Sequence, residues 1–552
     1  MYSEGIKATR KALTDLHQAL PAGSILFPHS KAYEESVFIG NSLYRWNSPA
    51  AVVQAVNEAD VQETVKFAAQ QNIQLSVRSG AHGFGGFCLN QGGIVLDIRS
   101  LNQVEVRPDG KEISIGGGAL WGDVYRTLHA NSNKRLAITG AHGATVGVGG
   151  FLLGGGVSTF SRSYGMGADN ILELTIVTAD GSLVTLNKES LEKDTTEEGQ
   201  RKRDLFWALQ GGGGGNFGVV THFQVKLYEF EDLEGTVVTG ELTWYLDEND
   251  QESQFQSMMT KWNETSWPSQ LSGDVLWVNE QGKRSAKLGI FYNGNMQKCN
   301  EAIRPLLEFS PTSTLKEEVL MQYNEYSDEP FTTSSRVFSH NTSAVLAEGQ
   351  MTPDLTKYLT GWAKEVTNSG GEPFVFCNHL GYATKEKNGQ KIDNNATPFP
   401  WREAEFICLL RASWSHTKQS DKMFDLVAQG KTELNKYALH GKAAYVNYLD
   451  KSLENWREAY FGDNYPKLQQ VKSAWDPDNV FRFAMGIERS GKDLNMPIDP
   501  NPAKNATIPE SFDLSKKALT DEVFAYISKA RKQVVPDLGA LQKKDRTVCV
   551  GC

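Results

Sequence analysis

Residues 76–86 read Ser-Val-Arg-Ser-Gly-Ala-His-Gly-Phe-Gly-Gly and follow directly on a β-rich run that begins at Ile73. Five of the nine residues from 78 to 86 are glycine or alanine, and His82 lies among them. Glycine at this density costs backbone entropy, so it is used where backbone amides must approach a ligand closely. We therefore expect this loop to lie against the pyrophosphate of a dinucleotide, with His82 reaching the ring system beyond it.

Two further glycine clusters follow, at residues 146–156 and 204–220. In the second of these, Gly213 to Gly218 fits the pattern G-x-G-x-x-G. A Rossmann fingerprint follows a strand and opens a helix, whereas this one follows a helical pattern and opens a strand predicted at 219–227. The Rossmann interpretation therefore fails. Three clusters together favour one extended ligand contacted by backbone at several points, with simple tight turns as the alternative.

Length and charge limit the class of protein. A chain of 552 residues is too long for one core, and its net charge of −10 argues against a nucleic-acid-binding protein. No apolar run reaches membrane-spanning length, and the N-terminus lacks the apolar core of a signal peptide, so we expect an intracellular, cytoplasmic protein with no membrane partner. The six cysteines are scattered, which does not suggest a disulfide framework. The final pair, Cys549 and Cys552, fits a frayed tail, with a redox pair, a metal half-site or a prenylation-like ending as alternatives.

Hydrophobic periodicity and composition divide the chain into two kinds of segment. The first includes a helix with a capping box at Asp60 and Glu63, a strand at 74–77 and a helix at 120–128. From residue 229 to 440 the glycine clusters become fewer and the aromatic residues more frequent, and predicted strands alternate with predicted helices. The strands predicted in this part are 236–244, 286–292 and 405–414, and the helices are 250–262 and 353–367. Because residues 441–487 again resemble the first kind of segment, the middle segment is interpreted as an insertion.

With these motifs the chain resembles the berberine-bridge-enzyme-like flavin oxidases, within the vanillyl-alcohol-oxidase type of FAD-binding fold. The resemblance runs from about residue 40 to 487. The motifs that carry it are Arg78–His82, Val146–Gly156, Asp204–Leu209 with its glycine run, Pro398–Arg402, Ala444–Asp450, Tyr460–Gly462 and Asp476–Phe481.

The resemblance implies an α+β protein of two lobes. A PCMH-type FAD-binding domain would be formed by residues 1–228 together with the return segment 441–487. An inserted substrate domain of antiparallel sheet and helices would occupy residues 229–440. Residues 488–552 would form a C-terminal extension.

FAD is the cofactor that the resemblance implies, attached covalently to His82 at the flavin 8α-methyl group. Many relatives attach the flavin a second time through a cysteine just before the V-G-V-G-G stretch, but Gly143 holds that position here. Attachment through His82 alone is therefore expected, with a noncovalent loop histidine as the alternative. His142 is expected to be a surface or hydrogen-bonded histidine, with contact to the flavin as the alternative. The other cofactor-binding residues expected are Arg78, Ser79, Gly80, Ala81, Gly83, Gly147, Val148, Gly149, Gly150, Phe151, Val157, Val220 and Asn447.

The chemistry that the resemblance implies is oxidation of a substrate C–H bond. A base takes a proton while a hydride passes to flavin N5, and dioxygen reoxidises the flavin with release of hydrogen peroxide. Tyr445 is the base expected, on a strand where Tyr445 and Asn447 share one face and Tyr448 the other. Because tyrosine titrates at about 10, the base needs a nearby positive charge or the dipoles of the flavin itself. By strand parity Arg411 faces the cleft and can supply it, although a plain salt bridge fits Arg411 equally well; Glu405 is the reserve base.

The substrate expected is a small hydrophobic molecule of secondary-metabolite type, with dioxygen as the electron acceptor. The aromatic-rich insertion and the single flavin attachment favour this interpretation. A carbohydrate or oligosaccharide oxidase is one alternative, and a non-redox cyclase or scaffold that merely holds FAD is another. The sequence leaves the oligomeric state open.

Overall fold

The computed structural model describes residues 12–44, 47–131, 135–232, 234–248, 250–280, 283–319 and 338–491. Predictions about the C-terminal extension beyond residue 491, including the pair Cys549 and Cys552, lie outside these ranges. Among the helices within them, none combines the length and the apolar character that a membrane crossing requires.

The first sheet delivers the chain into the loop that contains His82. Its strands are β1 (Ser24–Leu26), β2 (Ala51–Gln54), β4 (Ile94–Asp97) and β3 (Leu75–Arg78), in that spatial order. Strands β2, β4 and β3 run parallel, and β1 is antiparallel to β2. Helix α3 (Glu58–Gln70) connects β2 to β3, as a parallel pair requires.

The capping box predicted for this helix is wrong in its position. Asn57 is the N-cap, and its side chain accepts a hydrogen bond from the Asp60 backbone N–H. The Asp60 carboxylate instead accepts from the backbone amides of Ala22, Gly23 and Val56. Asp60 therefore holds the chain before β1 against the helix start.

The second sheet is antiparallel and carries the other two glycine clusters at its margins. Its strand order is β5 (Val104–Val106), β6 (Glu112–Gly116), β10 (Val219–Lys226), β8 (Ile171–Val177) and β9 (Leu183–Asn187). Helix α5 (Val148–Leu153) lies within the second glycine cluster. The third cluster follows α8 (Glu197–Leu209) and enters β10, so the sequence-based exclusion of a Rossmann fingerprint is confirmed. The helices α4 (Trp121–Ala130), α14 (Trp456–Phe461) and α15 (Tyr465–Trp475) share a buried core with this sheet.

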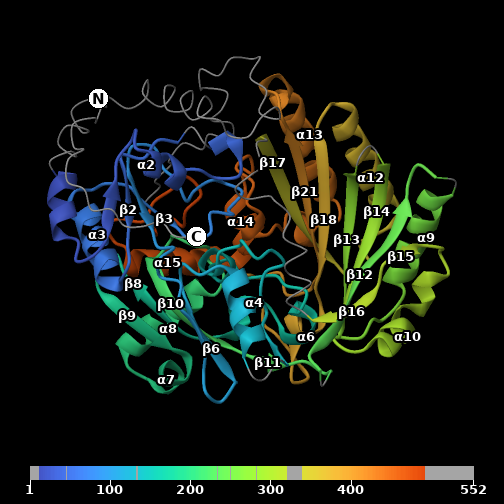
Figure 1. Ribbon diagram of the computed structural model, residues 1–552, viewed down its shortest axis with the longest axis horizontal. Coiled ribbons are helices and arrows are strands. Elements are labelled where there is room, and N and C mark those ends of the chain that lie inside the picture. The colour runs from blue at the N-terminus through green and yellow to red at the C-terminus, as the bar shows by residue number, and fades with distance from the viewer. Residues whose placement is uncertain are drawn as a thin grey trace.

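The third sheet is the largest and lies beside the first two (Figure 1). Seven strands follow the order β15 (Thr312–Ser313), β12 (Thr236–Tyr245), β14 (Lys283–Tyr292), β13 (Leu271–Glu280), β18 (Glu372–His379), β21 (Ala404–Trp414) and β17 (Phe338–Ala347), and β16 (Lys316–Val319) pairs with β12. Four helices cover its outer face: α9 (Gln251–Asn263), α10 (Met296–Leu307), α12 (Pro353–Asn368) and α13 (Ser420–Leu434). Large aromatic side chains such as Trp262 and Trp277 fill the layer between them. The inner face of the third sheet faces the glycine loops.

Buried Arg162, on α6 (Ser161–Tyr164), ties the second sheet's half of the molecule to the third sheet. Its guanidinium donates to the carbonyls of Leu271 at 2.6 Å, Leu380 at 2.7 Å and Trp267 at 3.1 Å. Leu271 is the first residue of β13, Trp267 lies shortly before that strand, and Leu380 directly follows β18. The α+β class is confirmed, whereas the domain boundaries at residues 228 and 440 stay predictions.

The remaining elements are short. They are α2 (Lys31–Ser36), β7 (Leu136–Ala137), α7 (Lys188–Lys193), β11 (Tyr228–Glu229), β19 (Glu386–Lys387) and β20 (Gln390–Lys391), together with 3₁₀ turns.

Candidate active site

A cavity of about 770 Å³ lies between the glycine loops and the inner face of the third sheet. This volume falls in the range of roughly 300–1,000 Å³ that is usual for ligand sites. One wall is backbone from the three glycine clusters, and the opposite wall is side chains from β13, β18 and β21. The cavity therefore joins segments that are far apart in the sequence.

Gly80 and Gly147, from the first two clusters, are required by close packing of backbone on backbone. A Cβ atom added to Gly80 would collide with the backbone of Gly147, and a Cβ added to Gly147 would collide with Gly80. Around the same cavity, Gly83 and Gly150 have no heavy atom within 4 Å of an added Cβ. Their backbone is thus open to a bound group, which fits the cradle that an extended cofactor needs.

His82 lines the cavity from the first glycine loop. Its Nε2 lies 2.9 Å from Oγ1 of Thr145, in the segment that precedes the second cluster. Burial, assisted by the positive charge of Arg411, lowers the pKa of the His82 imidazole to about 4. The ring is therefore neutral at physiological pH, and one of its nitrogens carries a lone pair.

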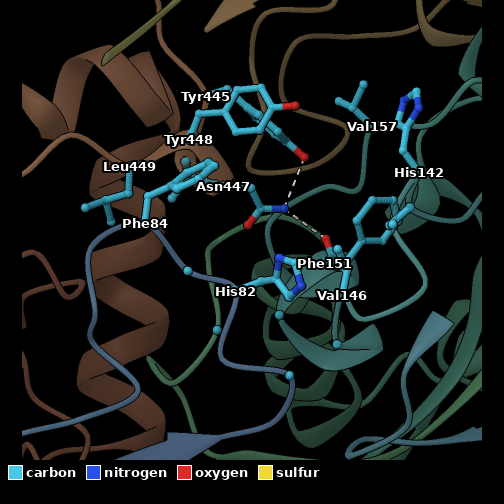
Figure 2. A pocket seen from close by; sticks show the side chains of 18 of the residues that line it. His82, Phe84, His142, Val146, Phe151, Val157, Tyr445, Asn447, Tyr448 and Leu449 are labelled. Atoms are coloured by element: carbon cyan, nitrogen blue, oxygen red, sulfur yellow. Dashed lines mark hydrogen bonds between the residues drawn. The ribbon is translucent and has the colours of Figure 1, made fainter. Parts of the chain in front are cut away.

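The motif around Tyr445 is a turn, not the predicted strand. Residues Val446–Tyr448 form a single 3₁₀ turn, η6, that follows Tyr445. Strand parity therefore does not apply, and Tyr448 lines the same cavity as Tyr445 and Asn447 (Figure 2). The prediction that Tyr448 faces away is wrong because the turn rotates its side chain back to the cavity.

The Tyr445 hydroxyl is buried and held by two N–H donors. Its oxygen accepts from the Gly156 backbone at 3.0 Å and from the Asn447 side-chain amide at 3.1 Å. The same amide donates to the Phe151 carbonyl at 3.1 Å (Figure 2). Burial raises the pKa of Tyr445 to about 12, although both donors oppose this shift. The phenol is thus oriented, and it is protonated at neutral pH.

Arg411 extends into the cavity wall from β21, as strand parity predicts. Its guanidinium lies 4.6 Å from the ring centroid of Phe374 and 5.9 Å from that of Phe84. Its charge acts on Tyr448 as well as on His82, and it opposes the rise that burial causes in the pKa of Tyr448. Glu405, the reserve base, does not line the cavity, and its carboxylate accepts from the Gly349 backbone N–H at 2.9 Å.

The cavity wall also contains a contact between His142 and Asp274, and this contact was not predicted from the sequence. Nε2 of His142 lies 3.5 Å from the Asp274 carboxylate, which also accepts from the His379 backbone N–H at 2.8 Å. Burial raises the pKa of Asp274, and the His142 charge opposes that rise. Close by, the Tyr448 hydroxyl donates to Asn378 at 2.6 Å. These residues come from unconnected segments, so no spacing in the sequence could bring them together; the only signal is a polar Asp274 within an apolar strand.

Most of the residues predicted to contact the cofactor line the cavity, and two do not. The guanidinium of Arg78 donates to the Phe38 carbonyl at 2.9 Å, and Val148, the first residue of α5, is buried in the core. Their contact with a cofactor stays a prediction, as do the roles of the others. The predicted residues that line the cavity are Ser79, Gly80, Ala81, His82, Gly83, Gly147, Gly149, Gly150, Phe151, Val157, Val220, Arg411, Tyr445 and Asn447.

Two family models match the parts of the chain that form this cradle. One is described as an FAD binding domain and matches residues 49–187, and the other is described as berberine and berberine like and matches residues 444–488. Together they cover the first two glycine clusters and the turn of Tyr445. The chain is an FAD-linked oxidoreductase that carries both an FAD binding domain and a berberine-like segment.

Curated relatives of this oxidoreductase match over most of their length. (R)-6-hydroxynicotine oxidase of Paenarthrobacter nicotinovorans is 27% identical, with 85% of this chain and 97% of the relative covered. Berberine bridge enzyme-like 1 of Arabidopsis thaliana is 26% identical, with 85% and 89% covered. The resemblance drawn from the motifs is thereby confirmed, and FAD is the cofactor.

Solved structures agree in fold. The wild-type BBE-like 1 of Physcomitrella patens superposes with a TM-score of 0.73 at 23% identity, covering 87% of this chain and all of that one. A chitooligosaccharide oxidase superposes with a TM-score of 0.71 at 21% identity, covering 88% and 100%. The predicted two-lobed PCMH-type fold is therefore confirmed. Within the described residues, no cluster of three or more His, Cys, Asp or Glu side chains could hold a metal ion.

Proposed function

We propose that this oxidoreductase oxidises a small, largely apolar substrate in the cavity and passes the electrons to dioxygen. The observation that carries the proposal is the contrast between the two walls. The glycine wall offers backbone to the cofactor, and the opposite wall presents Phe374, Phe376 and Leu409 to whatever lies between. Bound FAD supplies the hydride acceptor and the site of reoxidation by dioxygen. The apolar wall excludes water and binds the substrate by burial of apolar surface.

His82 is proposed as the sole covalent anchor of the FAD. Its neutral imidazole lies in the cavity, and Gly143 occupies the position of a second anchor in many relatives. Acid precipitation tests the anchor directly: the flavin should remain with the native chain and should be released from His82→Ala. Release of all flavin from the native protein would end the covalent proposal.

Tyr445 is proposed as the proton acceptor, and Arg411 as the cation of the substrate wall. The two N–H donors to the Tyr445 oxygen stabilise its negative charge when the proton leaves. The Arg411 guanidinium packs on Phe374, where it orients a ring or an oxygen of the substrate.

Oligosaccharide oxidation is a second proposal, favoured by the polar end of the cavity. Glu241, Ser272, Lys316 and Glu318 line that end and could bind sugar hydroxyls. One experiment separates the two proposals. Peroxide release is measured over a panel of aromatic alcohols, cyclic amines and oligosaccharides, and flavin bleaching is followed anaerobically. Bleaching without peroxide would identify a dehydrogenase, and the absence of both over the whole panel would favour a scaffold that only holds FAD.

A further inference from the structure

The first two glycine loops hold His82 against Thr145. Because Gly80 and Gly147 pack backbone on backbone, the residues beside them approach more closely than residues with side chains would permit. The result is the 2.9 Å contact between Nε2 of His82 and Oγ1 of Thr145. Thr145 thus touches the one histidine expected to bond to the cofactor.

This contact determines which ring nitrogen can react. A neutral imidazole has one N–H and one lone pair, and the partner of one nitrogen sets the role of the other. Since Nε2 is engaged by Thr145, the nitrogen left for a new bond is Nδ1. Nδ1 is nucleophilic only if Nε2 carries the hydrogen, and Nε2–H then donates to the Thr145 hydroxyl oxygen.

Bond formation at Nδ1 makes the ring positively charged until Nε2 gives up its proton. A hydrogen bond from Nε2–H to an oxygen strengthens as that charge develops, so it stabilises the transition state more than the starting state. Thr145 is well placed for this because its oxygen is already in contact with Nε2 before the reaction.

We propose that Thr145 is a positioning residue for the covalent attachment of FAD, which orients the His82 imidazole and accepts the Nε2–H bond while Nδ1 bonds to the flavin. This inference rests on the covalent anchor proposed above. The Nδ1–carbon bond forms at the 8α-methyl group, and one methyl C–H bond and the Nε2–H bond break with release of two protons. The two electrons left behind pass to the flavin ring and then to dioxygen, which with two protons becomes hydrogen peroxide.

The test uses the full chain produced under riboflavin starvation and then mixed with FAD. The covalent fraction is followed by acid precipitation, and reversible FAD binding is measured separately by flavin fluorescence. Thr145→Val keeps the shape of the side chain and removes its oxygen, so attachment should be about tenfold slower or worse while reversible FAD binding is unchanged. Thr145→Ser keeps the oxygen and should attach FAD at close to the native rate.

Two results would overturn the inference without touching the oxidase activity. One is attachment in Thr145→Val at the native rate. The other is a flavin-linked peptide from the native protein in which NMR shows substitution at Nε2. If the native chain attaches FAD and His82→Ala does not, the covalent anchor holds. Either of the two results above would then count against the role of Thr145 alone. The peroxide panel tests the oxidation independently of both.

Discussion

At the scale of single residues, Tyr445 combines two opposing influences on one oxygen. Burial disfavours the phenolate, while two N–H groups are aimed at the same atom and favour it. Because the phenol is protonated at neutral pH, Tyr445 can accept a proton from the substrate only in the small fraction of molecules in which it is ionised. The proposal that Tyr445 is the base therefore makes a definite claim about pH.

Replacing Tyr445 with phenylalanine should lower kcat by about 100-fold or more, the usual contribution of a positioned general base. Flavin content should stay native, because no cofactor anchor is lost. Since a base works in its deprotonated form and the pKa of Tyr445 lies at about 12, native turnover should rise with pH through the alkaline range. Steady-state kinetics from pH 6 to 10 checks both points.

Tyr460→Phe is the matched control for this experiment. It removes a buried phenol hydroxyl that accepts from the Asp450 backbone N–H, outside the cavity. This variant should keep native turnover. If Tyr445→Phe also turns over at the native rate, the His142–Asp274 pair becomes the proton acceptor to test next.

Arg411 makes a separate prediction about the pH dependence of flavin attachment. The His82 ring must be neutral to react; it is neutral above a pKa of about 4 and charged below it. The attachment rate should therefore be constant near pH 7 and fall as the pH drops through about 4. In Arg411→Met one of the two influences that lower this pKa is gone, so the fall should begin at higher pH. Identical pH profiles for the two proteins would show that the Arg411 charge does not reach His82.

At the scale of elements, the glycine loops could be predicted from the sequence and the substrate wall could not. Backbone access is a local property of glycine, so three clusters were enough to locate the cradle. The turn of Tyr448 and the pairing of Asp274 with His142 depend on contacts across the molecule. The cap of α3 shows the same limit, because Asn57 and Asp60 are both good N-cap residues and distant amides decide between them.

The contact between the first two loops predicts that Gly147→Ala loses cofactor. The added Cβ would collide with Gly80, so the loops must separate and the His82–Thr145 contact must lengthen. Flavin bound per chain, measured by absorbance on the purified protein, should fall well below the native value. Gly361→Ala is the control, since it adds a Cβ in open space within α12 and should leave flavin content native. Native flavin content in Gly147→Ala would contradict the tight packing.

Helix α6 makes a prediction about stability through Arg162. Arg162→Ala leaves the buried carbonyls of Leu271, Leu380 and Trp267 without their donor. The free energy of unfolding should fall by about 3 kcal/mol or more, measured by denaturant titration. Lys193→Ala, which removes an exposed ion pair with Glu189, should leave the free energy of unfolding almost unchanged. Equal effects of the two substitutions would show that Arg162 does not hold the two halves together.

At the scale of the whole molecule, the cavity is lined by residues from three sheets. A cofactor bound there should therefore stabilise all three sheets together. A ligand that binds only the folded state adds about 2.7 kcal/mol at a concentration of 100 Kd. The flavin-loaded protein should therefore melt at a higher temperature than the protein made under riboflavin starvation. Differential scanning calorimetry of the two preparations checks this, and equal melting temperatures would mean that the cofactor does not bridge the sheets.

The position of Arg411 also limits how this protein can change its substrate during evolution. Arg411 belongs to a strand that lines the cavity, and its charge also reaches His82, the proposed anchor of the cofactor. A substitution at Arg411 that suits a new substrate would at the same time disturb the anchoring of the flavin. Phe376 lines the same wall without a charge, so it is free to vary in size. New specificities should therefore arise first around Phe376, with Arg411 retained.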